Sequence, residues 1–353
     1  MHGSTSERAA HLVDRHPTVS PERLISQLRP PPTFAEVSFA TYHPDPAEPT
    51  QAAAVVACAD FCRQAVERRA GRRKLLGKRV VSPGVGLYLD GGFGVGKTHL
   101  LASSYYQLPG LGPDGATPKA FATFGELTQL AGVFGFVECI EMLASYTAVC
   151  IDEFELDDPG NTTLVSRMLS SLVERGVSVA ATSNTLPGQL GEGRFAAQDF
   201  LREINTLASI FTTVRIDGPD YRHRDLPPAP QPLSDEEVTA RAAAVDGATL
   251  DDFDALCAHL ATMHPSRYLT LIEGVTAVFL TGVHGIDDQN VALRLVSLTD
   301  RLYDAGIPVV ASGAKLDTIF GEEMLAGGYR KKYLRATSRL LALTAGVNEA
   351  REP

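Results

Sequence analysis

Short apolar runs alternate with longer stretches of helical spacing between residues 51 and 216. The runs have the length of strands, whereas the longer stretches carry apolar residues three and four positions apart. Strands that alternate with helices favour a parallel sheet with helices on both of its faces. We predict strands over residues 87–89, 119–123, 148–151, 177–181 and 211–216, and helices over residues 51–69, 99–106, 124–145, 164–175 and 189–210.

A glycine-rich segment lies between the first of these strands and a helix. Its sequence, GGFGVGKT, fits G-x-x-x-x-G-K-[ST], the phosphate-binding loop of P-loop NTPases, in the strand–loop–helix context that the motif requires. Backbone N–H groups and the helix N-terminus would face phosphate oxygens, Lys97 would reach the β- and γ-phosphates, and the Thr98 hydroxyl would bind Mg²⁺. We therefore predict a site for ATP and Mg²⁺ that is formed by Gly91, Gly92, Phe93, Gly94, Val95, Gly96, Lys97 and Thr98.

Polar side chains also follow two later strands. Asp152 and Glu153 come directly after one apolar run, and Asn184 follows the next. Ligands of parallel α/β sheets bind at the carboxyl ends of the strands. We expect Asp152 to bind Mg²⁺, Glu153 to orient or deprotonate the attacking water, and Asn184 to hold that water or the γ-phosphate. The alternatives are an exposed acidic turn and an asparagine that only ends a strand.

Hydrolysis in this class often needs an arginine from a neighbouring subunit, because charge spreads over the γ-phosphate oxygens in the transition state. Arg194 and Arg202, on the helix predicted after Asn184, are the candidates, although each could equally be a surface arginine. Arg339 is a candidate for sensing the γ-phosphate from the C-terminal region. An arginine supplied by a neighbour implies a homo-oligomer.

The pattern divides the chain into four parts. Residues 1–33 are polar and read as an N-terminal arm that is either disordered or packed on a neighbour. Residues 34–226 form the predicted P-loop core. Residues 227–250 begin with PPAPQP and read as a linker, because prolines interrupt regular structure. Residues 251–353 are predicted to be an α/β and helical region that completes the ATPase.

Residues 276–313 faintly repeat residues 147–184. Each copy reads as strand, polar turn, helix, glycine and strand. The second copy has Thr281 and Gly282 in place of the two acids, so we expect the C-terminal third to bind and hydrolyse no nucleotide by itself. A duplicated unit and the general pattern of any βαβ unit account for this match equally well.

Composition and charge narrow the function classes. The formal net charge of −10 is not that of a nucleic-acid coat protein, although residues 68–79 are strongly basic and read as a solvated helix end or a polyanion contact. Five scattered cysteines indicate buried, reduced thiols. The N-terminal residues lack the apolar core of a secretory signal, and no run of about 18 apolar residues occurs. We therefore expect a cytoplasmic protein.

Together these segments resemble the AAA+ ATPases, and more narrowly the ZapE family of bacterial cell-division ATPases, which is related to mitochondrial Afg-type proteins. The resemblance covers residues 39–341 and rests on FATYHPDPAEPTQAAA, GLYLDGGFGVGKTHLL, VCIDEFELDD, VAATSNTLPGQL, DGPDYRHRD and YLRATSRL. It implies hydrolysis of ATP at a membrane-associated division site, with the tubulin-like division-ring protein FtsZ as partner. It also implies that Tyr42 and Gln51 lie near the adenine pocket. The chain departs from the family at residues 196–199, AAQD, where arginines are usual.

Two other functions fit parts of the sequence. The string GGFGVGKTHLL is also close to those of the replication ATPases DnaA and IstB, in which case residues 68–79 and 330–332 would contact DNA phosphates. A nucleotide-dependent scaffold with weak hydrolysis would explain the missing arginines, whereas the intact Glu153 favours hydrolysis.

Overall fold

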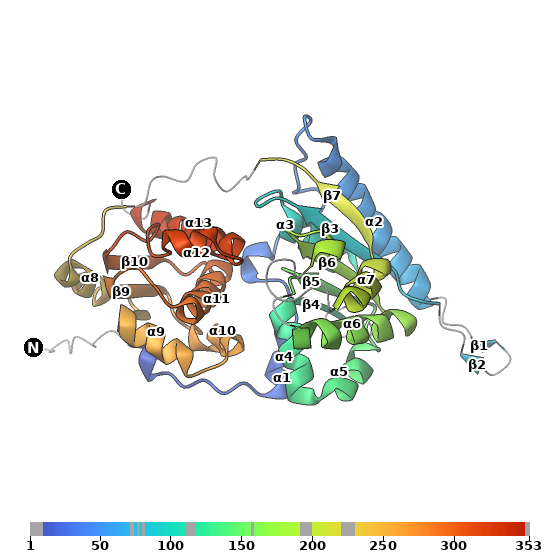
Figure 1. The fold of residues 1–353 in the computed structure, drawn as a ribbon, viewed down its shortest axis with the longest axis horizontal. Coiled ribbons are helices and arrows are strands. Elements are labelled where there is room, and N and C mark those ends of the chain that lie inside the picture. The colour runs from blue at the N-terminus through green and yellow to red at the C-terminus, as the bar shows by residue number, and fades with distance from the viewer. Residues whose placement is uncertain are drawn as a thin grey trace, which may run out of the picture. The chain divides into compact units, whose positions relative to one another are not determined.

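A computed structural model describes residues 10–70, 74–75, 78–79, 82–110, 118–156, 159–190, 200–219 and 230–349 (Figure 1). The chain forms two compact units. The first unit spans residues 20–221, and the second combines residues 1–19 with residues 222–353. Each unit has its own parallel sheet.

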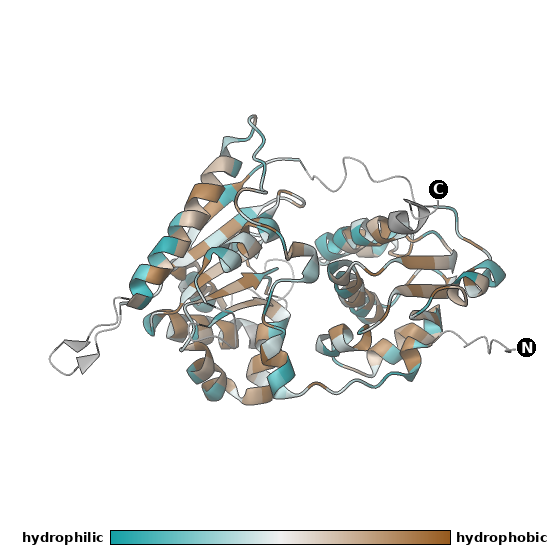
Figure 2. Ribbon diagram, turned by 180° about the vertical axis from the view of Figure 1, so that it is seen from behind, coloured by the Kyte–Doolittle hydropathy of each residue, from teal (hydrophilic) through white to brown (hydrophobic). Residues whose placement is uncertain are grey.

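The sheet of the first unit has five parallel strands in the order β4-β5-β6-β3-β7. Strand β6 lies between β3 and β5, so the carboxyl ends of these three strands meet at one edge. The strands are largely apolar (Figure 2), and β5 and β6 are buried along their whole length. The predicted strands are all confirmed, and the sheet consists of β3 (Gly86–Gly91), β4 (Lys119–Thr123), β5 (Ala148–Asp152), β6 (Ser178–Ser183) and β7 (Thr212–Ile216).

Helices cover both faces of this sheet, as predicted. Helices α2 and α3 share one buried cluster with β3 and β5, and right-handed crossovers place α4 to α7 on the opposite face. The helices are α1 (Pro21–Ser26), α2 (Pro49–Ala70), α3 (Lys97–Gln107), α4 (Phe124–Phe134), α5 (Phe136–Leu143), α6 (Pro159–Glu174) and α7 (Leu201–Ile210), with short 3-10 turns at Pro32–Phe34 and Pro187–Gln189.

Two details of this unit differ from the sequence prediction or complete it. The single helix predicted over residues 124–145 is broken into α4 and α5, because Gly135 has a φ of 88° and a ψ of 148°, outside the helical region. The basic residues 68–79 include the last turn of α2, where Arg69 donates to the carbonyl of Ala144 over 3.3 Å, and the short strands β1 (Lys74–Leu75) and β2 (Lys78–Arg79).

The second unit has a three-stranded parallel sheet in the order β10-β9-β8. A large buried cluster packs α9, α11 and α13 against this sheet, and Tyr268 and Phe253 are among its fully buried side chains. The elements are β8 (Ala248–Asp252), β9 (Ala277–Val283), β10 (Val309–Gly313), α8 (Asp235–Ala242), α9 (Phe253–Ala261), α10 (Tyr268–Leu271), α11 (Gln289–Ala305), α12 (Glu322–Ala326) and α13 (Arg330–Glu349), with 3-10 turns at Leu12–Asp14 and Pro265–Arg267.

The N-terminal arm predicted over residues 1–33 is divided between the two units. The Asp251 carboxylate accepts the backbone N–H groups of Leu12 and Val13 over 3.0 and 3.1 Å, and Leu12 is fully buried in the core of the second unit. Residues from position 20 onward belong to the first unit, where the Leu28 carbonyl accepts the N–H of Phe121 over 3.0 Å. These contacts join residues far apart in the chain, which the local apolar pattern does not reveal.

The linker predicted over residues 227–250 is also shorter than expected. Helix α8 begins within it at a capping box, in which Ser234 and Glu237 satisfy each other's backbone N–H groups, and β8 begins at Ala248. The prolines that suggested a linker therefore precede a helix start rather than a long irregular segment.

All five cysteines are buried and unbridged, as predicted. Burial raises the pKa of the Cys62 thiol to about 11, so the thiolate form is disfavoured at neutral pH.

We expect Leu12→Ala to destabilise the second unit by about 2–5 kcal/mol, because it leaves a cavity in a packed core. Urea unfolding of the full chain measures this loss. Asp14→Ala is the control, since Asp14 is exposed and its removal is expected to change stability by only about 0.5 kcal/mol. Unfolding of Leu12→Ala at the wild-type urea concentration would show that residues 10–19 add nothing to this core.

Candidate functional site

The glycine-rich loop joins β3 to α3 at the carboxyl edge of the five-stranded sheet. Gly94 and Gly96 have φ values of 65° and 84°, a conformation that glycine adopts without strain. A Cβ at Gly96 would also lie 2.5 Å from the ring of Tyr42. Helix α3 starts at Lys97 with no side-chain cap, so its first N–H groups are directed to the loop as anion donors.

Lys97 brings the loop and the end of β6 together. Its Nζ atom donates to the carbonyl oxygens of Gly91 and Gly92, over 3.0 and 2.5 Å, and to Oδ1 of Asn184 over 2.8 Å. The amide of Asn184 therefore lies beside the ammonium group predicted to contact the β- and γ-phosphates. This placement agrees with the role predicted for Asn184.

Thr98 and Asp152 meet beside this lysine. The Thr98 hydroxyl donates to Oδ1 of Asp152 over 3.2 Å, and the Asp152 side chain is 7 % exposed. A hydroxyl and a carboxylate are hard oxygen donors of the kind that Mg²⁺ prefers. Among the residues that the structure describes, no cluster of three or more His, Cys, Asp or Glu side chains could hold a metal by itself. The donor set thus fits an ion that takes its remaining ligands from phosphates and water.

Glu153 has an unusual backbone conformation. Its φ is 52°, and within the described ranges it is the one non-glycine residue with a positive φ. Non-glycine residues rarely adopt this region, and such strain clusters at functional sites. Its N–H donates to Oγ1 of Thr182 over 3.1 Å, and its side chain is half-buried. The turn at Glu153 sends the carboxylate in a different direction from that of Asp152.

Tyr42 and Gln51 flank the loop. The Tyr42 hydroxyl donates to the carbonyl of Val95 over 2.9 Å. The buried carboxamide of Gln51 accepts the N–H of Asp45 over 2.8 Å and donates to the carbonyl of Asp217, just after β7, over 2.9 Å. Gln51 thus braces the start of α2 against the end of the sheet, and the proximity of both residues to adenine stays a prediction.

The predicted arginines do not gather at this site. Arg194 lies outside the described residues, and Arg202 is an exposed residue of α7. Arg339 belongs to the second unit, where it forms an ion pair with Asp300 that Arg335 joins over 2.7 Å. Burial by itself would raise the pKa of Asp300, but the two guanidinium groups hold it below its usual value. The roles predicted for all three arginines stay predictions.

Sequence reasoning missed two features of the site. Thr182 bonds both acidic residues, although it lies in the segment ATSN that was singled out for Asn184. Asp90, buried at the end of β3, pairs with Arg215 of β7 over 2.5 Å. A charged residue within the apolar run LYLDG was the available signal for this pair, because a buried carboxylate needs a partner.

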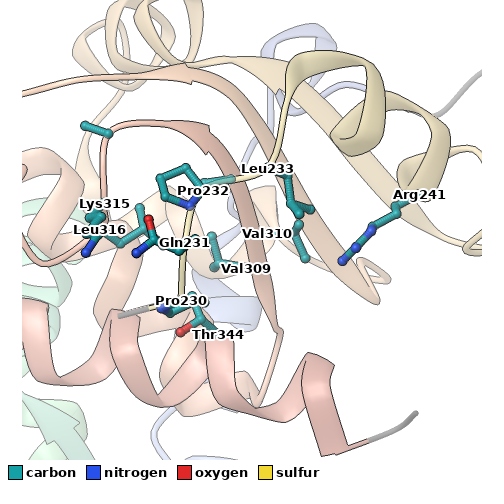
Figure 3. A pocket seen from close by; sticks show the side chains of 12 residues that line it. Pro230, Gln231, Pro232, Leu233, Arg241, Val309, Val310, Lys315, Leu316 and Thr344 are labelled. Atoms are coloured by element: carbon teal, nitrogen blue, oxygen red, sulfur yellow. The ribbon is translucent and has the colours of Figure 1, made fainter. Parts of the chain in front are cut away.

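A separate hollow of about 140 Å³ lies in the second unit, between residues 230–233, β10 and α13 (Figure 3). Its walls are mostly apolar, and Arg241 and Lys315 supply its cationic groups. No described residue predicted to bind nucleotide lines this hollow. It is therefore distinct from the P-loop site.

The described part of the chain contains no helix that is both long and apolar enough to cross a membrane.

Comparison with known proteins identifies relatives along most of the chain. A family model described as AFG1-like ATPase matches residues 18–235 and 227–352. The cell division protein ZapE of Escherichia coli K12 is 28% identical over 277 residues, which cover 68% of this chain and 74% of that protein. Lactation elevated protein 1 homolog B of Danio rerio is 25% identical over 242 residues, which cover 58% of this chain and 47% of that protein.

The chain is also similar to two solved structures. One is DnaI, with 19% identity, a TM-score of 0.39 and coverage of 56% of this chain and 98% of that chain. The other is AMPPCP-bound DnaA from Aquifex aeolicus, with 10% identity, a TM-score of 0.37 and coverage of 90% and 93%. Because the AFG1-like model matches residues of both units, the chain belongs to the AFG1-like ATPase family, and the prediction of an AAA+ ATPase of the ZapE and Afg type is confirmed.

Proposed function

We propose that this protein binds ATP with Mg²⁺, hydrolyses it to ADP and phosphate, and uses the cycle to remodel or regulate a protein partner. The observation that carries the proposal is the meeting of Lys97, Asp152, Glu153 and Asn184 at one edge of the sheet. These residues come from three neighbouring strand ends and supply the groups that phosphoryl transfer to water requires.

Binding uses the loop and the residues that follow it. The N–H groups at the start of α3 and the Lys97 ammonium would hold the phosphates, which would replace the loop carbonyls as partners of Nζ. Thr98 and Asp152 would hold Mg²⁺, which neutralises charge on the phosphate oxygens when it is bound.

Hydrolysis uses Glu153 and Asn184. The Glu153 carboxylate would orient the attacking water and accept its proton, as a general base. The Asn184 amide, beside Lys97, would hold that water or the γ-phosphate by hydrogen bonds. Neither residue forms a covalent bond to the substrate, so the protein contributes position and charge.

Phosphate release from Mg-ATP by the purified full chain tests the proposal directly. Release that requires Mg²⁺ and stops on addition of EDTA is expected. No release above the rate of Lys97→Ala protein, across a range of protein concentrations, would contradict ATP hydrolysis.

The arginine that completes the site is proposed to come from a neighbouring copy, with Arg202 and Arg194 as candidates. Activity per chain is then expected to rise with protein concentration and to level off as assembly completes. Measurement of phosphate release over about a hundredfold range of concentration, with sedimentation on the same samples, checks this expectation. A constant activity per chain from a monomer would contradict it.

Mixing two inactive variants gives a sharper form of this experiment. A site with Glu153 from an Arg202→Ala chain and Arg202 from a Glu153→Gln chain is complete, so the mixture should recover activity that neither variant has alone. The same pairing with Arg194→Ala distinguishes the two candidates.

The name of the ZapE relative favours a partner in cell division, and we propose the tubulin-like division-ring protein FtsZ as the first to test, with peripheral rather than spanning contact to the membrane. Binding of purified FtsZ that depends on ATP would support this choice. Binding of DNA at about 50 mM salt, with a steep loss at higher salt, would instead favour the replication-type alternative.

A further inference from the structure

A single buried hydroxyl links the two acidic residues of the site. Thr182, on β6, is 2 % exposed. Its Oγ1 donates to Oδ1 of Asp152 over 2.5 Å and accepts the N–H of Glu153 over 3.1 Å. A threonine hydroxyl has one proton to donate, so its donor serves Asp152 while its acceptor serves Glu153.

The backbone of Thr182 adds a second contact to the same turn. Its carbonyl accepts the N–H of Phe154 over 2.7 Å, so the residue receives two consecutive amides of the strand end that follows β5. Glu153, with its φ of 52°, lies between the side chain and the backbone of Thr182. A non-glycine residue keeps such a conformation only where surrounding contacts hold it, and these amide bonds are contacts of that kind.

The second βαβ unit of the chain contains the same device without the acid. Gly282, at the end of β9, has a φ of 68°, and its N–H donates to Oγ of Ser312 over 3.1 Å. Ser312 lies on β10 where Thr182 lies on β6, and Gly282 stands where Glu153 stands. The hydroxyl of Ser312 donates to Asp235 of α8 instead of to an acid on its neighbouring strand.

The comparison separates the turn from its use. A left-handed residue held by a hydroxyl on the next strand occurs in both units, and in the second unit glycine meets this requirement without strain. In the first unit a glutamate occupies the position, and the same hydroxyl also bonds the carboxylate of Asp152. The geometry therefore links the strained turn to both acids through one oxygen atom.

We propose that Thr182 is a positioning residue of the ATPase site, which acts on hydrolysis by fixing the direction of Glu153 relative to Asp152. The inference rests on the proposed hydrolysis of ATP. Thr182 would act through Glu153 and Asp152, without itself contacting the nucleotide. Loss of its hydroxyl should therefore lower the turnover number kcat and leave nucleotide affinity nearly unchanged.

Thr182→Val and Thr182→Ser test this inference in the full chain. Valine keeps the branched shape without the hydroxyl, and serine keeps the hydroxyl. We expect Thr182→Val to lower kcat by about 10- to 100-fold, because small misplacements of a catalytic group cost this much, while the Kd of a fluorescent ATP analogue changes by less than about threefold. Thr182→Ser should retain kcat to within about threefold of the wild-type value.

Ser312→Ala is the matched control. It removes the equivalent hydroxyl in the second unit and is expected to leave kcat unchanged. A wild-type kcat in Thr182→Val, or a loss of affinity as large as the loss of kcat, would overturn the inference. Thr182→Ala provides the same comparison if the valine variant does not fold. If the wild-type protein releases phosphate and Thr182→Val matches it, the positioning role fails alone; if the wild type releases none, the proposed function fails.

Discussion

Lys97→Ala is expected to weaken ATP binding by at least about 100-fold, or about 2.8 kcal/mol. The Lys97 ammonium lies within the loop and points at the carbonyls of Gly91 and Gly92, so it is the cation placed to meet the phosphate chain. Charge-assisted hydrogen bonds to phosphate are among the strongest that a side chain makes, and alanine offers no replacement. Titration with a fluorescent ATP analogue in the presence of Mg²⁺ measures the change.

Lys315→Ala is the control for the loss of one positive charge. Lys315 lines the hollow of the second unit, so its removal should leave ATP affinity at the wild-type value. Circular dichroism of Lys97→Ala should match the wild type, since Lys97 is only half-buried. ATP affinity that is equal in Lys97→Ala and wild type would mean that the glycine-rich segment is not the phosphate site.

The sequence predicted the parts of the site that depend on local pattern. The loop after β3, the acids after β5 and the asparagine after β6 each follow a short apolar run. Strand ends of a parallel sheet meet at one edge, so three separate motifs could be placed together before their contacts were known. The 2.8 Å contact between Lys97 and Asn184 agrees with that reasoning.

Contacts between distant residues could not be predicted in this way. Leu12 and Asp251 are 239 positions apart, and the apolar pattern around Leu12 is too short to indicate that it belongs to the second unit. The ion pair of Arg339 with Asp300 depends on how α13 packs on α11. Side-chain chemistry alone suggested a sensor arginine, whereas the structure shows a buried pair within one unit.

The conformation of Glu153 was equally hidden. Glutamate has no preference for positive φ, so the residue type gives no sign of the left-handed turn. The alignment of residues 276–313 with residues 147–184 offered an indirect signal, because it places Gly282 at the same position. Glycine often marks a left-handed site, and the structure gives both residues a positive φ.

Glu153→Gln is expected to keep ATP affinity within about threefold of the wild type, well under 1 kcal/mol, and to lower kcat by about 10²- to 10⁴-fold. Glutamine has the same shape and backbone preferences, so the turn and its bond to Thr182 should persist. It cannot accept the proton of the attacking water. Single-turnover phosphate release and analogue titration separate the two quantities.

Glu174→Gln, an exposed position at the end of α6 in the same unit, is the control for the loss of one acidic group. Its turnover and affinity should equal those of the wild type. Full turnover in Glu153→Gln would remove Glu153 from the role of general base.

Glu153→Gly distinguishes the chemical role of this residue from its structural one. Glycine adopts a φ of 52° without the penalty of about 1–3 kcal/mol that a left-handed non-glycine residue carries, although it gains entropy in the unfolded chain. We therefore expect the first unit to become more stable by about 1 kcal/mol, measured by urea unfolding, while turnover is lost as in Glu153→Gln. A variant that is both more stable and inactive would show that the strain at this position is retained for catalysis. A loss of stability would instead mean that the Glu153 side chain holds the fold.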